Sequence, residues 1–225
     1  MIRIVSAGAA QGLVGSVARR DGIQVEGSFG AVGAMIEKFR AGEPCDVVVL
    51  THKQIEELER EGAVVAGTAM DLGAAPTSIA VRVGDAAPDV SAADALRGAL
   101  LAADAIYFPD PAKATAGIHF ASVLEKLGIT AQTAPRWKTY PNGATAMREM
   151  AKASGSPIGC TQATEILATP GVTLVAPLPA GYSLATVYTA AVSARATDAP
   201  AAIRFVQALG GVGSARLRRE AGFEE

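Results

Sequence analysis

The sequence predicts an α/β fold, in which short buried strands alternate with amphipathic helices. Three observations point to it. The segment DVVVL at residues 46–50 is nearly all apolar and β-branched, as a strand buried on both faces should be. Val32, Met35, Ile36 and Phe39 follow the spacing of one helix face. With 225 residues, the chain is long enough for one large domain or two small ones.

The first third of the chain predicts three strands, each followed by a helix. Residues 2–6 form the first strand, and a helix runs from about residue 10 to residue 20. A second strand at 23–28 leads through a glycine-rich stretch into the helix that carries Phe39. After the strand at 46–50, Thr51 caps a helix that ends near Gly62.

The middle of the chain repeats this alternation after residue 76. The predicted strands there are 77–83, 106–108, 158–160 and 172–175. The predicted helices are 91–101, the segment around Phe120 that ends before Gly128, and 144–153. Residues 134–143, which contain Trp137 and Tyr140, are expected to form a loop.

The end of the chain predicts a return strand and two helices. Residues 185–192 (ATVYTAAV) are rich in strand-forming residues. Pro200 opens a long helix, and residues 214–223 form a short last one. The layout predicts two lobes, the first comprising residues 1–80 and 186–225 and the second comprising residues 81–185.

Composition excludes several classes of function. The net charge of −2 gives no electrostatic basis for binding nucleic acid. No apolar run reaches the length of a membrane span, so no membrane insertion is expected. The two cysteines, Cys45 and Cys160, are expected to be free buried thiols. No metal or cofactor is expected, since only two histidines occur and they stand far apart in the sequence.

The stretch GSFGAVGAM at residues 27–35 raises the question of a phosphate-binding loop. Its glycines, Gly27, Gly30 and Gly33, are spaced G-x-x-G-x-x-G, unlike the G-x-G-x-x-G of dinucleotide sites. The chain also lacks a P-loop lysine motif, an HExxH motif and a G-x-S-x-G nucleophile elbow. A nucleophile–base pair of Cys160 and His119 is conceivable, but Cys160 in a strand and His119 in a helix start fit a structural role better.

Small or neutral residues follow the predicted strands at their carboxyl ends, where open α/β sheets bind ligands. Helix N-termini there present N–H groups and a positive dipole end, which suit an anion. The predicted ligand-binding residues are Gly8, Ala9, Gly30, Ala31, Val32, Thr51, Thr115, Ala116, Gly143 and Gln162. Lys113, Arg82 and Arg136 are candidate cationic partners of a carboxylate ligand.

This pattern resembles the molybdate-binding protein family of type II periplasmic solute-binding proteins. The resemblance rests on SAGAAQGL near the N-terminus, on residues 22–57 around GSFG and GEPCD, on ATAGIHFASVLEKLGI, and on SPIGCTQATEI. It implies a two-lobe fold with a ligand cleft between the lobes, a small anion as ligand and an ABC permease as partner. The chain has no enzymatic activity under this interpretation.

The resemblance also implies a changed ligand. The family holds its oxyanion with two serine hydroxyls and a tyrosine, and the matching positions here look like Ala9, Val32 and Gln162. Backbone donors would lie near Ala116 and Gly143. Because the three hydroxyls are missing, a small organic acid fits the chain better than molybdate does.

Two alternatives stay open from the sequence. A cytoplasmic enzyme or sensor for a small metabolite could use the same fold, with His119, Gln162 or Cys160 carrying the chemistry. An effector-sensing domain is a weaker third alternative. If Met1 is the native start, the absence of a signal peptide predicts a cytoplasmic protein; if a signal was removed, the protein is periplasmic.

Overall fold

The computed structural model describes residues 1–225, the whole sequence. The chain divides into two compact units, the first formed by Met1–Ala75 and Thr186–Glu225 and the second by Pro76–Ala185. The first boundary, between Ala75 and Pro76, lies inside one continuous strand, β4 (Met70–Arg82). No helix has the length and apolar character needed to cross a membrane.

The sheet of unit 1 has the strand order β2-β1-β3-β9. Its strands are β1 (Ile2–Ala7), β2 (Val25–Gly30), β3 (Val47–Thr51) and β9 (Ala185–Val192). Strand β1 pairs in parallel with β2 and β3, whereas β9 runs antiparallel to β3. The carboxyl ends of β1, β2 and β3 therefore share one edge of this sheet.

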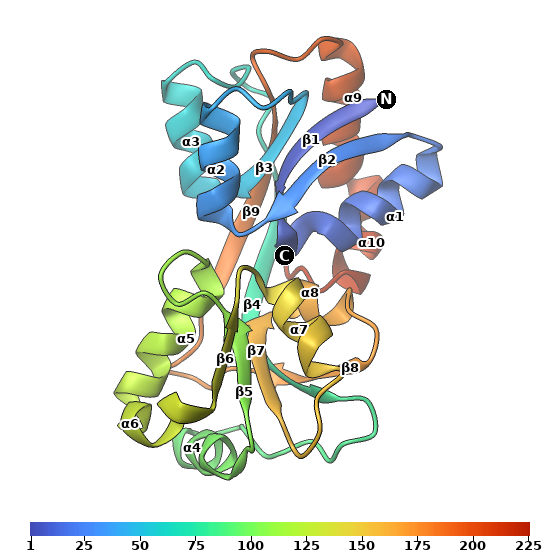
Figure 1. Cartoon of the computed structure of the whole chain (residues 1–225). Helices are drawn as coiled ribbons and strands as arrows, with labels where there is room; N and C mark the ends of the chain where they lie inside the picture. The colour runs from blue at the N-terminus through green and yellow to red at the C-terminus, as the bar shows by residue number, and fades with distance from the viewer. The chain divides into compact units, whose positions relative to one another are not determined.

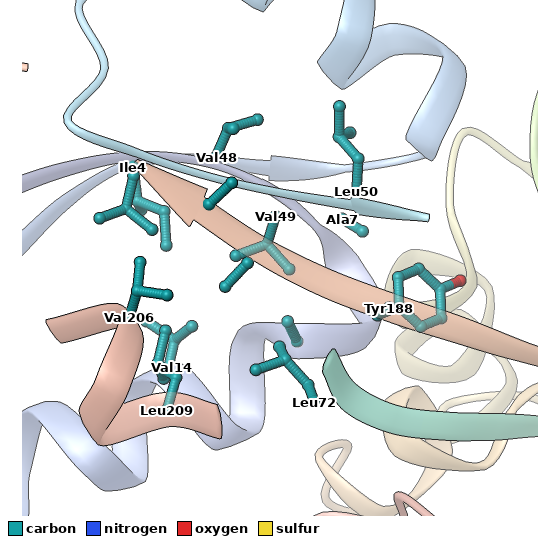
Figure 2. Packing of buried hydrophobic residues seen from close by; sticks show 14 of the residues in the cluster. Ile4, Ala7, Val14, Val48, Val49, Leu50, Leu72, Tyr188, Val206 and Leu209 are labelled. Carbon is teal, nitrogen blue, oxygen red and sulfur yellow. The ribbon is translucent and has the colours of Figure 1, made fainter. Parts of the chain in front are cut away.

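Helices cover both faces of this sheet (Figure 1). On one side lie α2 (Val32–Arg40) and α3 (His52–Arg60), and on the other α1 (Gln11–Asp21), α9 (Ala199–Gly210) and α10 (Ala215–Glu220). Short 3₁₀ turns, η1 (Gly8–Ala10) and η3 (Val212–Ser214), precede α1 and α10. The core combines strand residues such as Ile4 and Val49 with Val14, Val206 and Leu209 of the helices (Figure 2).

Unit 2 has the order β4-β7-β5-β6, and β8 (Val172–Pro177) pairs with β4. Strand β5 (Ile106–Pro109) runs parallel to β6 (Trp137–Tyr140) and to β7 (Ile158–Gln162), and β7 is antiparallel to β4. The helices of this unit are α4 (Ala93–Ala102), α5 (Thr115–Lys126), α6 (Thr130–Thr133), α7 (Gly143–Met150) and α8 (Ala163–Leu167), with the 3₁₀ turn η2 (Ala134–Arg136).

The second unit has two separate hydrophobic clusters. One joins α4 and α5 to the sheet through residues such as Leu96, Phe108 and Phe120. The other joins α7 and α8 through Met147 and Ile166. Together the two units confirm the α/β class predicted from the sequence.

The structure corrects several predicted elements. Residues 137–140 form strand β6 rather than part of a loop, because their backbone pairs with all four residues of β5. Strand β4 begins at Met70, well before residue 77. Helix α8 was not predicted, since its five residues are too few to show a helical period.

Strand β2 ends at Gly30, two residues beyond the predicted end at Ser28. Gly27 lies within the strand, as predicted, and is paired with Ile4 of β1. Its φ is +151°, and a Cβ at this position would lie 1.9 Å from the carbonyl oxygen of Ile4. Gly27 thus allows a close approach of two strands, and only Gly30 and the residues after it lie at the strand end.

Candidate ligand-binding site

In unit 1 the predicted residues gather at one sheet edge. Ala7 and Gly30 are paired neighbours at the ends of β1 and β2, and Thr51 ends β3 beside them. Gly8 and Ala9 form the 3₁₀ turn after β1, and Ala31 is the N-cap of α2 with Val32 as its first residue. The edge therefore presents the starts of three helical segments together.

The N-cap residue of helix α2 is Ala31, whose side chain accepts no hydrogen bond from the N–H groups of the first turn. Ala31 has an extended backbone, with φ −60° and ψ 140°, but no side chain accepts a hydrogen bond from the first turn. No acidic residue lies in that turn. Serine, threonine, aspartate or asparagine would normally supply such an acceptor. The first N–H groups of α2 are thus suited to an acceptor from outside the chain.

Helix α3 differs from α2, because its start is satisfied by a side chain. Thr51 is its N-cap, as predicted, and the amide oxygen of Gln54 lies 2.9 Å from the Thr51 hydroxyl. The Thr51 backbone N–H donates to the same oxygen at 3.3 Å. The Thr51 hydroxyl is therefore engaged within the protein.

In unit 2 the same arrangement occurs at the carboxyl ends of β5, β6 and β7. Helix α5 begins at Thr115 after the N-cap Ala114, which again supplies no side-chain acceptor and has no acidic residue after it. Gly117 of the first turn packs against the carbonyl oxygens of Pro109 and Asp110, where a Cβ would lie 2.3 Å from each. The start of α5 is thus held against the end of β5 with its own N–H groups uncapped.

Helix α7 has a satisfied start. Asn142 is its N-cap and accepts a hydrogen bond from Thr145 N at 2.8 Å. The backbone N–H groups of Gly143 and Ala144 donate to the carboxylate of Glu165 in α8. Gly143 is therefore placed at the predicted strand edge, but its donor already has a partner within the protein.

Gln162 ends β7 and is buried, with Thr77 of β4 as its paired neighbour. The hydroxyl oxygens of Thr77 and of Thr164, two residues after Gln162, are buried and have no hydrogen-bond partner. Buried polar atoms without partners are rare in folded proteins and call for an explanation such as a missing ligand. This is the polar part of the unit 2 edge.

Of the three predicted cationic residues, the two arginines are hydrogen-bonded within the protein and the lysine is exposed. Arg82 pairs with Asp85 and donates to the carbonyl oxygens of Ala153 and Gly155. Arg136 donates to the carbonyl oxygens of Leu101, Ala103 and Gln132. Both side chains serve local structure: Arg82 is paired with Val172 of β8, and Arg136 directly precedes the first residue of β6. Lys113 is exposed and directly precedes the N-cap of α5.

The cysteines are free and buried, as the sequence predicts. Burial raises the pKa of the Cys45 thiol to about 12 and raises the pKa of Cys160 well above its ordinary value. His119 Nε2 lies 2.7 Å from the carbonyl oxygen of Tyr182. A thiolate is the reactive form of cysteine, so these environments do not make a Cys160–His119 nucleophile–base pair.

Sequence reasoning missed Glu165, which is 7% exposed. Burial raises its pKa, while hydrogen bonds from the Thr161 hydroxyl and from the N–H groups of Ala144, Gly143 and Gln162 act in the opposite direction. The T-x-x-x-E spacing of Thr161 and Glu165 was visible in the sequence, but its meaning depends on α8, a helix the sequence did not predict.

The structure is similar to solved periplasmic binding proteins along its whole length. The periplasmic molybdate-binding protein of Azotobacter vinelandii matches with a TM-score of 0.77 and 21% identity, covering 100% of this chain and 99% of that one. The sulfate-binding protein SubI of Mycobacterium tuberculosis matches with a TM-score of 0.72 and 20% identity, covering 99% and 85%. At these identities the likeness concerns the fold, and it confirms the fold that the sequence resemblance implied.

Sequence comparison adds a relative and a family. An aconitate isomerase of a Pseudomonas species is 26% identical over 198 residues, which is 85% of this chain and 71% of that protein. The family model described as bacterial extracellular solute-binding protein matches residues 2–224. With that match spanning nearly every residue, the chain belongs to the bacterial extracellular solute-binding protein family.

Proposed function

We propose that this chain binds a small organic acid and releases it again, through backbone N–H donors at uncapped helix starts. The observation that carries the proposal is the pair of uncapped helix starts, α2 after Ala31 and α5 after Ala114. Both follow parallel strands at the sheet edge where α/β proteins bind ligands. Membership of a solute-binding family supports the same role.

The chemistry of these positions favours an organic acid over a compact oxyanion. Ala9 and Val32 supply no side-chain donor, and the Thr51 hydroxyl is engaged by Gln54. Each hydrogen bond to a charged group contributes about 1.5–3 kcal/mol, so a dianion without hydroxyl donors is held weakly. Val32 belongs to the hydrophobic core of unit 1 and brings no polar atom to the site, whereas the exposed Lys113 offers a flexible cation for a carboxylate.

The wider setting of this function follows from the family. We propose that the protein acts outside the cytoplasm and delivers its ligand to an ABC permease. The periplasmic molybdate-binding protein that shares the fold supports this setting. Ligand-dependent co-purification of the chain with an ABC permease from its own cells would test the partnership.

Calorimetric titration tests the binding role. Wild-type protein is titrated with cis-aconitate, trans-aconitate, citrate, molybdate and sulfate, and compared with Ala31→Asp. The new carboxylate would cap α2 and compete with the ligand for its N–H groups. It should stabilise the fold by about 0.5–1 kcal/mol while lowering anion affinity at least about tenfold.

A matched control is available on α4. Ala92 is also an extended N-cap without a side-chain hydrogen bond, but α4 begins after an exposed turn rather than at the end of a strand. Ala92→Asp should leave anion affinity unchanged. Equal loss of affinity in both variants would contradict the assignment of α2.

A second candidate function is an isomerase or related enzyme for a polycarboxylic acid. It is supported by the aconitate isomerase that shares 26% identity over most of this chain. His119 is the residue to test, since its ring is half-buried in α5 and its Nε2 is fixed by Tyr182. Incubation with cis-aconitate, followed by proton NMR, should show the trans isomer under this alternative, and His119→Ala should abolish it.

A further inference from the structure

The carboxylate of Glu165 in unit 2 is held by donors that could otherwise bind an anion. Its Oε2 lies 2.5 Å from the Thr161 hydroxyl, and its carboxylate accepts hydrogen bonds from the N–H groups of Gly143, Ala144 and Gln162. These are the kinds of donors that hold a bound oxyanion at a helix start. The protein thus places its own carboxylate where a ligand's charged group would otherwise bind.

The fit around this carboxylate is tight. A Cβ built on Gly143 would lie 1.9 Å from the Thr161 hydroxyl oxygen and 2.0 Å from Glu165 Oε2. Glycine is therefore required at the first position of α7 for the carboxylate to reach the backbone. The close packing indicates a permanent arrangement between α7 and α8 rather than an accidental surface contact.

The carboxylate changes the electrostatics of two predicted ligand residues, Gly143 and Gln162. The start of an α-helix carries a partial positive charge, and a buried anion there cancels it. A second anion brought to the same donors would find them already bonded to Glu165 and, at a pH where Glu165 is ionised, would meet a like charge with little solvent screening. The starts of α2 and α5 carry no such internal anion.

We propose that Glu165 determines which ligands the protein accepts, by excluding negative charge from the start of α7. A compact dianion such as molybdate or sulfate presents charge on every side and is therefore disfavoured. A larger organic acid can turn its carboxylates toward other donors and a neutral part toward α7. This inference rests on the proposed anion-binding function and names the residue that sets its selectivity.

The test compares ligand preference, which a purely structural role would not alter. The ratio of the dissociation constants for sodium molybdate and trans-aconitate is measured by calorimetry in wild type, Glu165→Gln and Glu149→Gln. Glu165→Gln removes the charge and should shift the ratio toward molybdate at least about tenfold. Glu149→Gln removes a carboxylate from the last turn of α7, where it pairs with Lys152, and should leave the ratio unchanged.

An unchanged ratio in a folded Glu165→Gln protein would overturn the inference while the proposed function stands. If the wild type binds none of the tested anions, both the proposed function and this inference are overturned. Should Glu165→Gln fail to fold, the wild-type crystal structure with trans-aconitate decides. A ligand carboxylate bound to Gly143 N or Ala144 N overturns the inference, and a neutral ligand atom facing them supports it.

Discussion

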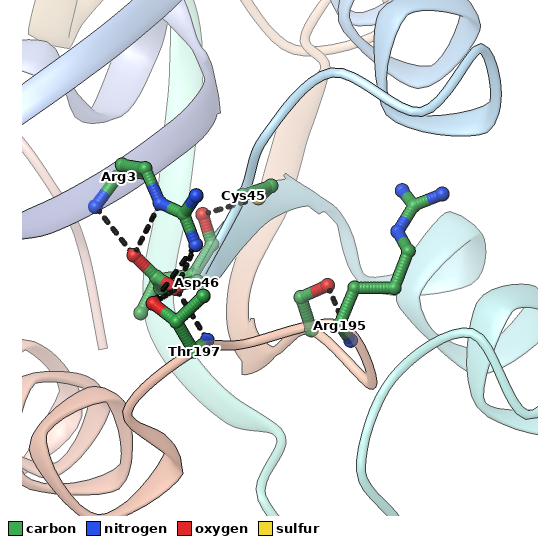
Figure 3. Close-up of polar contacts among 7 residues, drawn as sticks. Arg3, Cys45, Asp46, Arg195 and Thr197 are labelled. Carbon is green, nitrogen blue, oxygen red and sulfur yellow. Dashed lines mark hydrogen bonds and ion pairs between the residues drawn. The ribbon is translucent and has the colours of Figure 1, made fainter.

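Arg3 Nη2 lies 2.7 Å from Asp46 Oδ1, and this ion pair joins the first strand of the chain to the segment that precedes β3 (Figure 3). Asp46 also accepts hydrogen bonds from the backbone N–H groups of Arg3 and Thr197. Its side chain is 3% exposed, and these partners lower the pKa of the Asp46 carboxyl well below its usual range. One carboxylate therefore connects three segments of unit 1.

Asp46→Asn should destabilise the protein strongly. The substitution removes the negative charge that pairs with Arg3 and weakens the hydrogen bonds from the backbone N–H groups of Arg3 and Thr197. The free energy of unfolding should therefore fall by about 2–4 kcal/mol. Chemical denaturation at pH 7 measures the change. Glu220→Gln, which breaks the exposed pair with Arg216, is the control and should change the free energy of unfolding far less, because solvent screens that pair. If the two substitutions lowered the free energy of unfolding equally, the claim that Asp46 holds three segments of unit 1 together would be contradicted.

Gly27→Ala should be much more harmful than Gly22→Ala. Both glycines have positive φ, but a Cβ at Gly27 would meet the Ile4 carbonyl at 1.9 Å, whereas nothing lies within 4 Å of one at Gly22. Gly22→Ala should cost about 1 kcal/mol from backbone strain alone. Gly27→Ala should cost at least about 3 kcal/mol, because β1 and β2 must separate. Thermal unfolding of the two variants would show whether the difference exists.

Cys45 and Cys160 should resist alkylation in the native protein. Burial raises both thiol pKa values, that of Cys45 to about 12, so almost no thiolate forms at pH 8. Mass spectrometry after iodoacetamide treatment should find both cysteines unmodified, and both should react once guanidinium unfolds the chain. Rapid labelling of either one in the folded protein would contradict their burial.

Glu165 should give the protein a stability that falls as the pH rises. Burial raises its folded-state pKa above the ordinary value of 4.5, so the folded protein holds the proton more tightly than the unfolded chain does. The contribution of Glu165 to stability is therefore greatest below pH 4.5, and it is lost as the pH rises through the folded-state pKa. The difference in unfolding free energy between wild type and Glu165→Gln, measured from pH 4 to pH 8, should follow this direction. A difference that grows in favour of wild type with rising pH would contradict it.

The sequence predicted the parts of the fold that local pattern determines. The buried strand around Val47–Thr51 and the helix face of Val32, Met35 and Phe39 occur as expected, because burial imposes these patterns on a single segment. Strand β6 was missed because WKTY becomes a strand only through pairing with β5. Gly27 lies within the strand predicted at 23–28, but the need for glycine there depends on the close approach of Ile4 in a neighbouring strand, which the sequence does not show.

Only those parts of the candidate site that depend on local sequence could be predicted. Helix starts after strands can be inferred from the sequence, and Ala31 and Thr115 lie at such starts. Whether a start is available to a ligand depends on side chains from elsewhere. Gly143 and Glu165 are separated by a strand and a loop, so their contact was not visible in the sequence. The carbonyl partners of Arg82 and Arg136 were likewise not predicted, because a cation's partners are set by tertiary structure.

A crystal structure of the wild-type protein grown with trans-aconitate tests the central claim most directly. We expect a ligand carboxylate oxygen within hydrogen-bond distance of the backbone N–H groups at an uncapped helix start, either that of α2 around Val32 or that of α5 around Ala116. A ligand bound away from both helix starts, with those N–H groups facing only water, would contradict it.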